Sequence, residues 1–290
     1  MPPTVPSGLV GAVEHLRCPH CAQPLAVDDA TDAAALRCPR GHGFDVARSG
    51  YVSLLASRAN TGTADTAAMV AARETVLRAG HLDGVTALLR AAAACLGDGV
   101  PGCVVDLGAG TGHHLASVIE ALPDRQGVAL DVSVPAARRA ARAHPRIGAV
   151  VCDVWQPLPV RDATAALVLD VFAPRVGAEA RRVLRPGGSL LVVTPTPRHL
   201  ADLVGELGLL SVDGHKSERL AATLGPHLAL IEEQGYDAEL AIPRVDAAAI
   251  AAMGPSAHHL DPDRLRERVA TLPPLVDITV SVTLTVWRRH

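Results

Sequence analysis

The sequence has 290 residues, of which 49% are hydrophobic and 20% charged, with a formal net charge of −3. This length suits a globular chain with one large and one small domain, and the charge excludes the strongly basic balance of a sequence-independent nucleic-acid binder. No apolar run reaches the ~18 residues of a membrane span, and the proline-containing N-terminus lacks the basic start of a secretory signal. Cysteines without such a signal predict a cytoplasmic protein with reduced thiols.

A turn-rich segment over residues 15–57 follows a loose tail over residues 1–14 and holds two ligand pairs. The pairs have the spacing Cys18-x2-Cys21-x16-Cys38-x3-His42. Thiolates and an imidazole suit a tetrahedral Zn²⁺ site, and the spacer is long enough to bring the second pair back to the first. Four protein ligands would fill the coordination sphere, so we expect a structural zinc; chance spacing of the cysteines is the alternative.

The chain divides into three parts. Residues 1–57 carry the tail and a zinc-ribbon-like domain, residues 58–100 form a linker and helices, and residues 101–290 form the large domain. Residues 58–67 are small and polar, as expected of a linker. Residues 68–95 repeat apolar side chains with helical period, and the glycines of AGHLDG predict a break between two helices.

From residue 103 onward, predicted strands alternate with predicted helices. The strands are CVVDL, GVALDV, GAVVCDV, TAALVLDVF and GSLLVVTP, followed near the C-terminus by HLALIEEQGYDAELAI and ITVSVTLTVWRR. The helices are HHLASVIEAL, PAARRAARAH and EARRVLRPGG, the last ending at its glycines. This alternation predicts an α/β fold with a doubly wound parallel sheet. The basic run with Arg138, Arg139, Arg142 and Arg146 is either a solvated helix face or a local binding patch.

The segment VVDLGAGTGHH, residues 104–114, turns from a strand into a helix through Gly108, Gly110 and Gly112. Glycines here let a nucleotide cofactor approach the backbone at the helix N-terminus. NAD sites and S-adenosylmethionine sites both begin in this way. The pattern D-x-G-x-G-x-G resembles motif I of the class I S-adenosylmethionine methyltransferases.

Acidic residues at the ends of the next two strands distinguish an S-adenosylmethionine site from an NAD site. Asp131 can accept both ribose hydroxyls, and Asp153 can accept from the adenine amino group, while LRPGGSLLVVTP resembles the post-motif segment of the methyltransferases. A dehydrogenase would share Asp131 but neither of the other features; caps of helices or turns are the alternative roles for both aspartates. The sequence therefore predicts a class I, Rossmann-like S-adenosylmethionine methyltransferase with a small N-terminal zinc-binding domain.

Further segments extend the resemblance over nearly the whole chain. They are GFDVARSGYVSLL, MVAARETVLRAGH, VFAPR and TPTPRHL. With the zinc pattern and the glycine loop, the sequence resembles the 23S ribosomal RNA guanine-N1 methyltransferases, and within them the tylosin- and mycinamicin-resistance branch. The resemblance implies methylation of guanosine 748 in a hairpin loop, resistance to such macrolides, and a 23S rRNA stem-loop as partner. Similar enzymes suggest a homodimer.

The resemblance also assigns residues to the cofactor. It places S-adenosylmethionine against the loop from Gly108 through His114, which includes His113, and it places His199 at the cofactor's edge. In the family an aromatic residue can follow the Gly-His of the helical segment. Leu82 stands at that position here, so no stacking contact is expected from it.

N1 of guanine lies on the pairing edge and carries a proton at neutral pH. Turning the base out of a single-stranded loop solves the access problem, and a nearby group must take the proton. At the end of the fourth strand, LDVFAP offers Phe172 for stacking and Asp170 as the candidate catalytic residue; core packing is the alternative for Phe172. The zinc domain would add an RNA-reading surface through Arg17, Arg37, Arg40 and Arg48.

Two other classes of function stay open. One is a small-molecule methyltransferase, as in antibiotic biosynthesis, whose zinc is only a folding staple. The other is a non-enzymatic zinc-ribbon binding protein with a relic cofactor fold. The intact glycines and both strand-end aspartates favour an enzyme over the non-enzymatic binding protein. Methylation of naked 23S rRNA would distinguish an RNA methyltransferase from a small-molecule methyltransferase.

Overall fold

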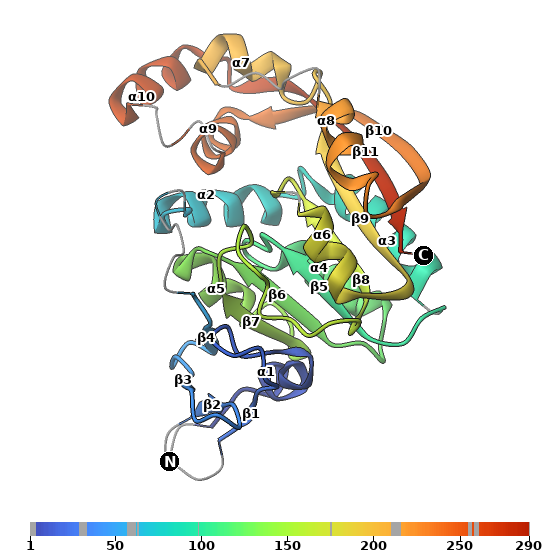
Figure 1. Cartoon of the computed structure of the whole chain (residues 1–290). Helices are drawn as coiled ribbons and strands as arrows, with labels where there is room; N and C mark the ends of the chain where they lie inside the picture. Colours follow the sequence, from blue (N-terminus) through green and yellow to red (C-terminus); the bar gives the residue numbers. More distant parts are fainter. Residues whose placement is uncertain are drawn as a thin grey trace.

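The computed structural model describes residues 4–28, 34–56, 62, 64–97, 99–174, 176–209, 216–254, 257 and 261–289. A small N-terminal unit lies at one end of a larger α/β domain, and α9 (Arg244–Met253) and α10 (Pro262–Thr271) lie at the other (Figure 1). Half of the predicted linker over residues 58–67 falls outside the described residues. Within the described part, no helix is both long and apolar enough to cross a membrane.

The N-terminal unit is a small antiparallel sheet of very short strands. Its strands are β1 (Ala26–Val27), β2 (Ala35–Arg37) and β3 (Gly43–Asp45), in that spatial order. Strands of two or three residues bury too little apolar surface to hold a fold alone. Leu25 and Leu36 are nevertheless buried, in the same apolar cluster as the adjoining face of the large sheet.

The tail predicted to be loose is a packed helix. Helix α1 (Ser7–Ala12), which leads into the 3₁₀ turn η1 (Val13–His15), lies against strand β7 (Ile147–Val151) of the large sheet, and Leu9 is fully buried. Close approach depends on two glycines, because a Cβ on Gly8 would lie 2.2 Å from the Ile147 carbonyl oxygen and one on Gly148 would lie 2.5 Å from Ala12 Cβ. The sequence prediction was wrong here because this contact is made with a strand more than a hundred residues away.

The large sheet has eight strands in the order β10-β11-β9-β8-β5-β6-β7-β4. The strands not yet bounded are β4 (Tyr51–Ser53), β5 (Cys103–Leu107), β6 (Gly127–Asp131), β8 (Ala165–Val171), β9 (Leu184–Pro195), β10 (Ala229–Pro243) and β11 (Leu275–Arg288). All predicted strands are confirmed, but the sheet is mixed, because β11 runs antiparallel to both β9 and β10. Strand β4 leaves the zinc-binding unit and pairs in parallel with β7, so the two units share one sheet.

Helices cover both faces of this sheet. They are α2 (Ala67–Arg78), α3 (Asp83–Gly97), α4 (His113–Ala121), α5 (Val134–Ala140), α6 (Gly177–Val183), α7 (Ala201–Leu207) and α8 (Lys216–Leu224), besides those named above. Side chains alternate along a strand, so Val104 joins an apolar cluster with α3 and α4 while Val105 joins a second cluster with α1 and α6. The predicted break between α2 and α3 is confirmed at Gly80, whose φ is +80°.

One helix end differs from its prediction. The helix expected in EARRVLRPGG stops at Val183, and the glycines that should end it lie in strand β9. The Gly187 N–H donates to the Arg289 carbonyl, and the Arg289 N–H donates to the Gly188 carbonyl. Pairing with the end of the chain thus draws the segment into the sheet.

Candidate active site and metal centre

Three cysteines and a histidine converge in the N-terminal unit. The ligand atoms of Cys18, Cys21, Cys38 and His42 all lie within 4.8 Å of one another. His42 Nδ1 is 3.5 Å from Cys18 Sγ and 3.3 Å from Cys38 Sγ, and the sulfurs of Cys21 and Cys38 are 3.6 Å apart. A tetrahedron with Zn–S bonds of ~2.3 Å has edges of about 3.8 Å, so the four donors fit a closed zinc site with no position for a substrate.

Tight turns hold these donors. The Ala22 N–H donates to the Cys18 carbonyl, and the Gly41 N–H donates to the Cys38 carbonyl, each at 2.9 Å. Gly41 has a φ of +86°, which a residue with a side chain adopts only with strain. The two ligand pairs are therefore positioned by the local backbone as the spacing predicted.

The residue beside the first ligand fastens the zinc-binding unit to the large domain. Arg17, with 17% of its side chain exposed, donates to the Leu158 carbonyl and forms ion pairs with Asp162 and Glu179. The Arg17 N–H also donates to the Pro159 carbonyl at 3.0 Å. Arg17 is thus engaged within the protein, whereas the hypothesis gave it to RNA.

The other three arginines of that hypothesis lie on the surface. Arg37 pairs with Asp28 at 2.8 Å and keeps 47% of its side chain exposed. Arg40 and Arg48 are exposed. These three remain candidates for a partner surface.

The glycine loop connects β5 to α4 in a tight left-handed turn. Gly108, Gly110 and Gly112 have φ values of +66°, +55° and +76°. A Cβ on Gly108 would also lie 2.8 Å from Ala173 Cβ. Both the backbone geometry and the space therefore require glycine, and the loop leaves the backbone open to a cofactor.

Asp131 supports this loop directly. Its Oδ2 accepts the Gly110 N–H and its Oδ1 accepts the Ser133 N–H, both at 2.8 Å. Burial raises the pKa of this carboxyl, although the two hydrogen bonds oppose the rise. A role in holding turns, which the sequence left as the alternative, is thus present; the ribose contact stays a prediction.

Two further aspartates lie at the same edge of the sheet. Asp106 and Asp170 are 2% and 1% exposed, and burial, followed by the charges of Asp170 and Asp131, raises the pKa of Asp106 well above its usual value. This acidic cluster (Asp106, Asp131 and Asp170) favours a cationic ligand. S-adenosylmethionine carries a sulfonium and an ammonium, while NAD carries an anionic pyrophosphate. The donor set therefore fits S-adenosylmethionine and disfavours a dehydrogenase.

The remaining cofactor candidates face different neighbours. Asp153, 5% exposed at the end of β7, accepts the Trp155 N–H at 3.0 Å. His114 Nδ1 lies 3.0 Å from Thr86 Oγ1, and burial, aided by the charges of His113 and Arg73, lowers the pKa of His114 to about 3. The ring of His114 is thus neutral and turned toward α3. Its contact with the cofactor, like that of Asp153, stays a prediction.

His199 and Phe172 meet beyond the ends of β8 and β9. Their ring centroids are 5.5 Å apart, and His199 Nδ1 accepts the Ser281 N–H at 3.2 Å. Phe172 is 40% exposed and has a φ of +57°, while Leu200, next to His199, has a φ of +55°. Bulky residues occupy this region only under strain, and strain of this kind gathers at functional sites. Phe172 therefore lies exposed on the surface, and the core-packing alternative is wrong.

One arginine that covers the loop had no role predicted from its sequence position. Arg73 Nη1 pairs with Asp65 at 2.6 Å, Nη2 donates to the Met253 carbonyl at 3.0 Å, and a Cβ on Gly110 would lie 3.1 Å from Nη1. The residue stands in MVAARETVL as an ordinary helical arginine. Only the packing of α2 over the loop brings it to the site.

Comparisons with known proteins agree with this architecture. A zinc-ribbon family model described as "RlmA, N-terminal" matches residues 16–59, and a model described as "Methyltransferase domain" matches residues 104–188. The fold, the glycine loop and the Cys₃His cluster thus define a class I S-adenosylmethionine-dependent methyltransferase with an N-terminal structural zinc ribbon.

Two relatives narrow this class. The 23S rRNA (guanine(748)-N(1))-methyltransferase of Streptomyces fradiae is 52% identical over 95% of this chain and 97% of its own. A protein of Micromonospora griseorubida named "Putative 23S rRNA (guanine-N(1)-)-methyltransferase" is 53% identical over 94% of this chain and 97% of its own. The chain belongs to the 23S rRNA (guanine-N1) methyltransferase family, which confirms the resemblance found in the sequence and sets aside the non-enzymatic alternative.

Proposed function

We propose that the protein transfers the methyl group of S-adenosylmethionine to N1 of guanosine 748 in a hairpin loop of 23S rRNA. The observation that carries the proposal is the 52% identity, over 95% of the chain, to the Streptomyces fradiae enzyme named for that position. A small-molecule methyltransferase with a purely structural zinc would not need identity that extends through the zinc ribbon. The full-length match therefore favours RNA over the small-molecule alternative.

The cofactor side of the site suits this reaction. When bound, S-adenosylmethionine supplies a methyl group on a positively charged sulfur. The acidic cluster attracts that charge, and the positive-φ glycines Gly108 and Gly110 allow close approach of the backbone. Asp131 keeps the loop in shape through the Gly110 N–H. These residues bind and orient, which is the main contribution a protein makes to an in-line transfer.

The substrate side is proposed to lie at Phe172. The guanine must leave its loop so that N1 can face the methyl group, and a turned-out base is held by stacking on a flat side chain. Phe172 is exposed, follows directly on β8 and has its ring braced by His199. His199 in turn is fixed by the Ser281 N–H.

The N1 proton must be lost as the new bond forms, and we propose Asp170 as its acceptor, directly or through a water. Asp170 lies two residues before Phe172, and its Oδ1 accepts the Ala173 N–H at 3.3 Å, so it also holds the turn that presents the ring. Asp170→Asn is expected to lower kcat by ~10²-fold or more with an altered pH profile. A kcat within threefold of the native value would remove Asp170 from the proton path.

The test of the proposed function is primer extension on 23S rRNA after incubation with S-adenosylmethionine, because methylated N1 stops the polymerase. A new stop at guanosine 748 is expected, and no methyl transfer to naked 23S rRNA or to ribosomal particles would contradict the function. Phe172→Ala is expected to raise the KM for RNA about tenfold or more, since base stacking contributes ~1–3 kcal/mol, whereas Phe172→Tyr should retain most of it. Binding of S-adenosylmethionine should be equal in both variants.

Three finer statements belong to the same proposal. Expression in a sensitive host is expected to confer resistance to tylosin and mycinamicin, which drug-susceptibility measurement would check. The enzyme would act in the cytoplasm, where 23S rRNA is found, and no cysteine of the described residues is paired in a disulfide, as is usual in that compartment. A homodimer would use an exposed edge such as β10, whose Leu230 and Ile231 are 47% and 43% exposed; sedimentation would detect it.

A further inference from the structure

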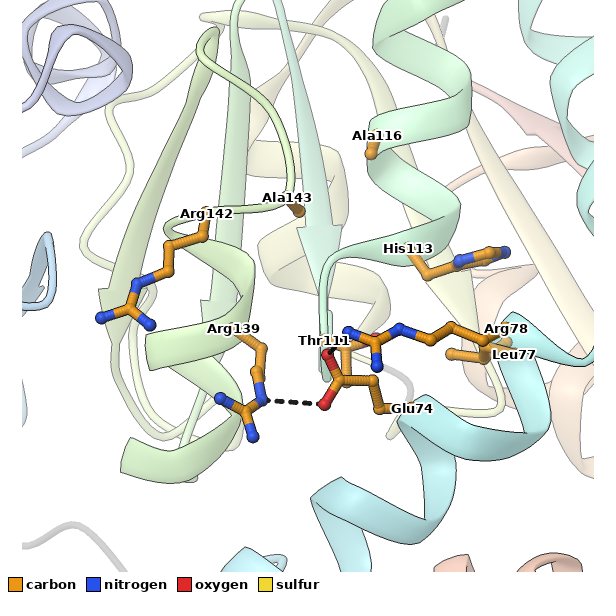
Figure 2. Close-up of a pocket in the computed structure, with 9 residues that line it drawn as sticks. All are labelled: Glu74, Leu77, Arg78, Thr111, His113, Ala116, Arg139, Arg142 and Ala143. Carbon is orange, nitrogen blue, oxygen red and sulfur yellow. Dashed lines mark hydrogen bonds and ion pairs between the residues drawn. The ribbon is translucent and has the colours of Figure 1, made fainter.

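A basic groove lies on the outer side of the glycine loop. Its volume is about 430 Å³, and it is formed by α2, the start of α4 and α5 (Figure 2). Arg139 of α5 and Arg142, in the turn that follows α5, stand on one side, Arg78 of α2 on the other, and Thr111 of the loop lies between them. Cationic side chains thus meet beside the loop that is assigned to the cofactor.

The charge of the groove is positive. Glu74 is its one acidic lining residue, and it pairs with Arg78 at 2.7 Å and with Arg139 at 3.1 Å. The Arg142 side chain is exposed and forms no hydrogen bond or ion pair with the described residues, although the Arg142 backbone N–H donates to the Arg139 carbonyl. The groove therefore holds three guanidinium groups and one carboxylate, which pairs with two of them. With 77% and 44% of their side chains exposed, Arg78 and Arg139 can turn toward an anion.

The groove continues toward the zinc ribbon. A turn over Ala47–Gly50 leads out of the ribbon, and a Cβ on Gly50 would lie 3.4 Å from Ala141 Cβ at the end of α5. Arg48 is exposed in this turn, and Arg142 follows Ala141. The turn that carries Arg48 therefore packs against the residue that precedes Arg142, so cationic residues of the ribbon and of the groove lie on neighbouring segments.

The basic run of the sequence splits into two roles. The Arg146 guanidinium donates to the carbonyls of Ile119, Leu122 and Arg125, so its hydrogen bonds are made within the protein. Arg139 and Arg142 instead line the groove. The acidic cluster lies at the strand ends and the arginines lie on the helices outside them. A cationic cofactor and an anionic polymer would therefore be attracted to separate surfaces of one site.

We propose that Arg48, Arg78, Arg139 and Arg142 form a basic track that binds the phosphodiester backbone of the RNA stem-loop between the zinc ribbon and the active site. The inference rests on the proposed function, since it names where that substrate lies. Guanidinium groups pair with phosphates in a fork geometry, and phosphate contacts position an RNA without reading its sequence. The track gives a protein of net charge −3 a local surface for a polyanion.

The experiment measures binding of a hairpin RNA by fluorescence anisotropy over a series of KCl concentrations. Arg139→Gln/Arg142→Gln is expected to weaken binding about fivefold per arginine and to reduce the slope of log K against log[KCl] by ~0.7–0.9 per lost phosphate contact. Glu74→Gln is expected to tighten binding, because it removes the negative charge from the groove. Arg181→Gln, on α6 at the opposite face of the sheet, is the matched control and should leave both quantities unchanged.

Calorimetric binding of S-adenosylmethionine should equal the native value in all these variants. The proposed track would be contradicted if the double variant kept the native RNA affinity and salt slope. It would also be contradicted if Arg181→Gln weakened RNA binding as much as the double variant does. A structural defect would weaken the Glu74→Gln variant as well, so the opposite signs distinguish the two causes. If the native protein neither binds nor methylates the RNA, the proposed function fails; if it methylates and the double variant matches it, only the track fails.

Discussion

The zinc ribbon and the methyltransferase domain are held together by different forces. The ribbon has strands of two or three residues around four metal donors, whereas the large domain buries two apolar clusters on the faces of an eight-stranded sheet. The ribbon is not independent, however, since Leu25 and Leu36 belong to one of those clusters and Arg17 docks on Asp162 and Glu179. A small domain thus gains order from a metal and from its neighbour together.

Removal of zinc should have the largest effect, and this effect should be confined to the ribbon. Cys38→Ser, or chelation of the native protein, should unfold the ribbon while the large domain keeps a cooperative transition, because structural zinc contributes about 10 kcal/mol or more to small zinc domains. Hydrogen exchange should show loss of protection in β2 and β3, with β5 and β8 protected. Retained protection in β2 after complete metal loss would show that apolar contacts hold the ribbon unaided.

Matched leucine truncations should separate the two cores. Leu169→Ala and Leu36→Ala each remove a fully buried side chain, and such changes cost ~2–5 kcal/mol. The first should lower the denaturation midpoint of the large domain with zinc retained. The second should speed zinc loss to a chelator. Equal zinc loss in both variants would mean that the ribbon and the sheet unfold as one unit.

Breaking the docking contact should have a smaller effect. Glu179 accepts the Leu158 N–H and pairs with Arg182, and, although burial opposes it, these partners hold its pKa below the usual value. Glu179→Gln should cost ~1–3 kcal/mol in urea unfolding at pH 7. A carboxylate with a lowered pKa stabilises the fold above its unfolded value, so the loss should shrink as the pH falls below about 4.5.

Asp162 provides the control for that contact. It joins the same network with 68% of its side chain exposed, so Asp162→Asn should cost less than ~1 kcal/mol. A larger loss of stability from Asp162→Asn than from Glu179→Gln would mean that the exposed ion pairs of Asp162 contribute more to docking than Glu179 does.

Mild acid should lower the stability of the large domain by an amount within the range expected for Glu179→Gln. The folded pKa of His114 is about 3, below the ordinary value of 6.5, so protons bind the unfolded chain first as the pH falls. Stability is complete above pH 6.5 and should fall by about 1.4 kcal/mol at pH 5.5 from this residue. Thermal unfolding should show that His114→Asn loses less stability than the native protein between pH 7.5 and pH 5.5. An identical loss in the two proteins would mean that His114 does not cause the acid destabilisation.

Much of the site followed from local sequence. The spacing of Cys18, Cys21, Cys38 and His42 predicted the metal centre because the turns that present the ligands are local. The glycine loop was equally clear, since positive φ values need glycine wherever they occur. Residues whose partners are distant were not predicted: Arg17 was assigned to RNA, α1 was taken for a tail, and Arg73 had no role.

By itself the sequence determined the family, the Cys₃His cluster, the glycine loop and the order of strands and helices, because these depend on residue type and short spacing. Tertiary structure alone decided that β4 joins the large sheet, that three aspartates form an acidic cluster, and that the turn carrying Arg48 packs against Ala141 at the end of α5. The physical reason is that charge and burial depend on neighbours in space. Parallel strands place residues from distant segments of the chain at the same edge of the sheet, and the local sequence pattern does not show which of these residues will be neighbours.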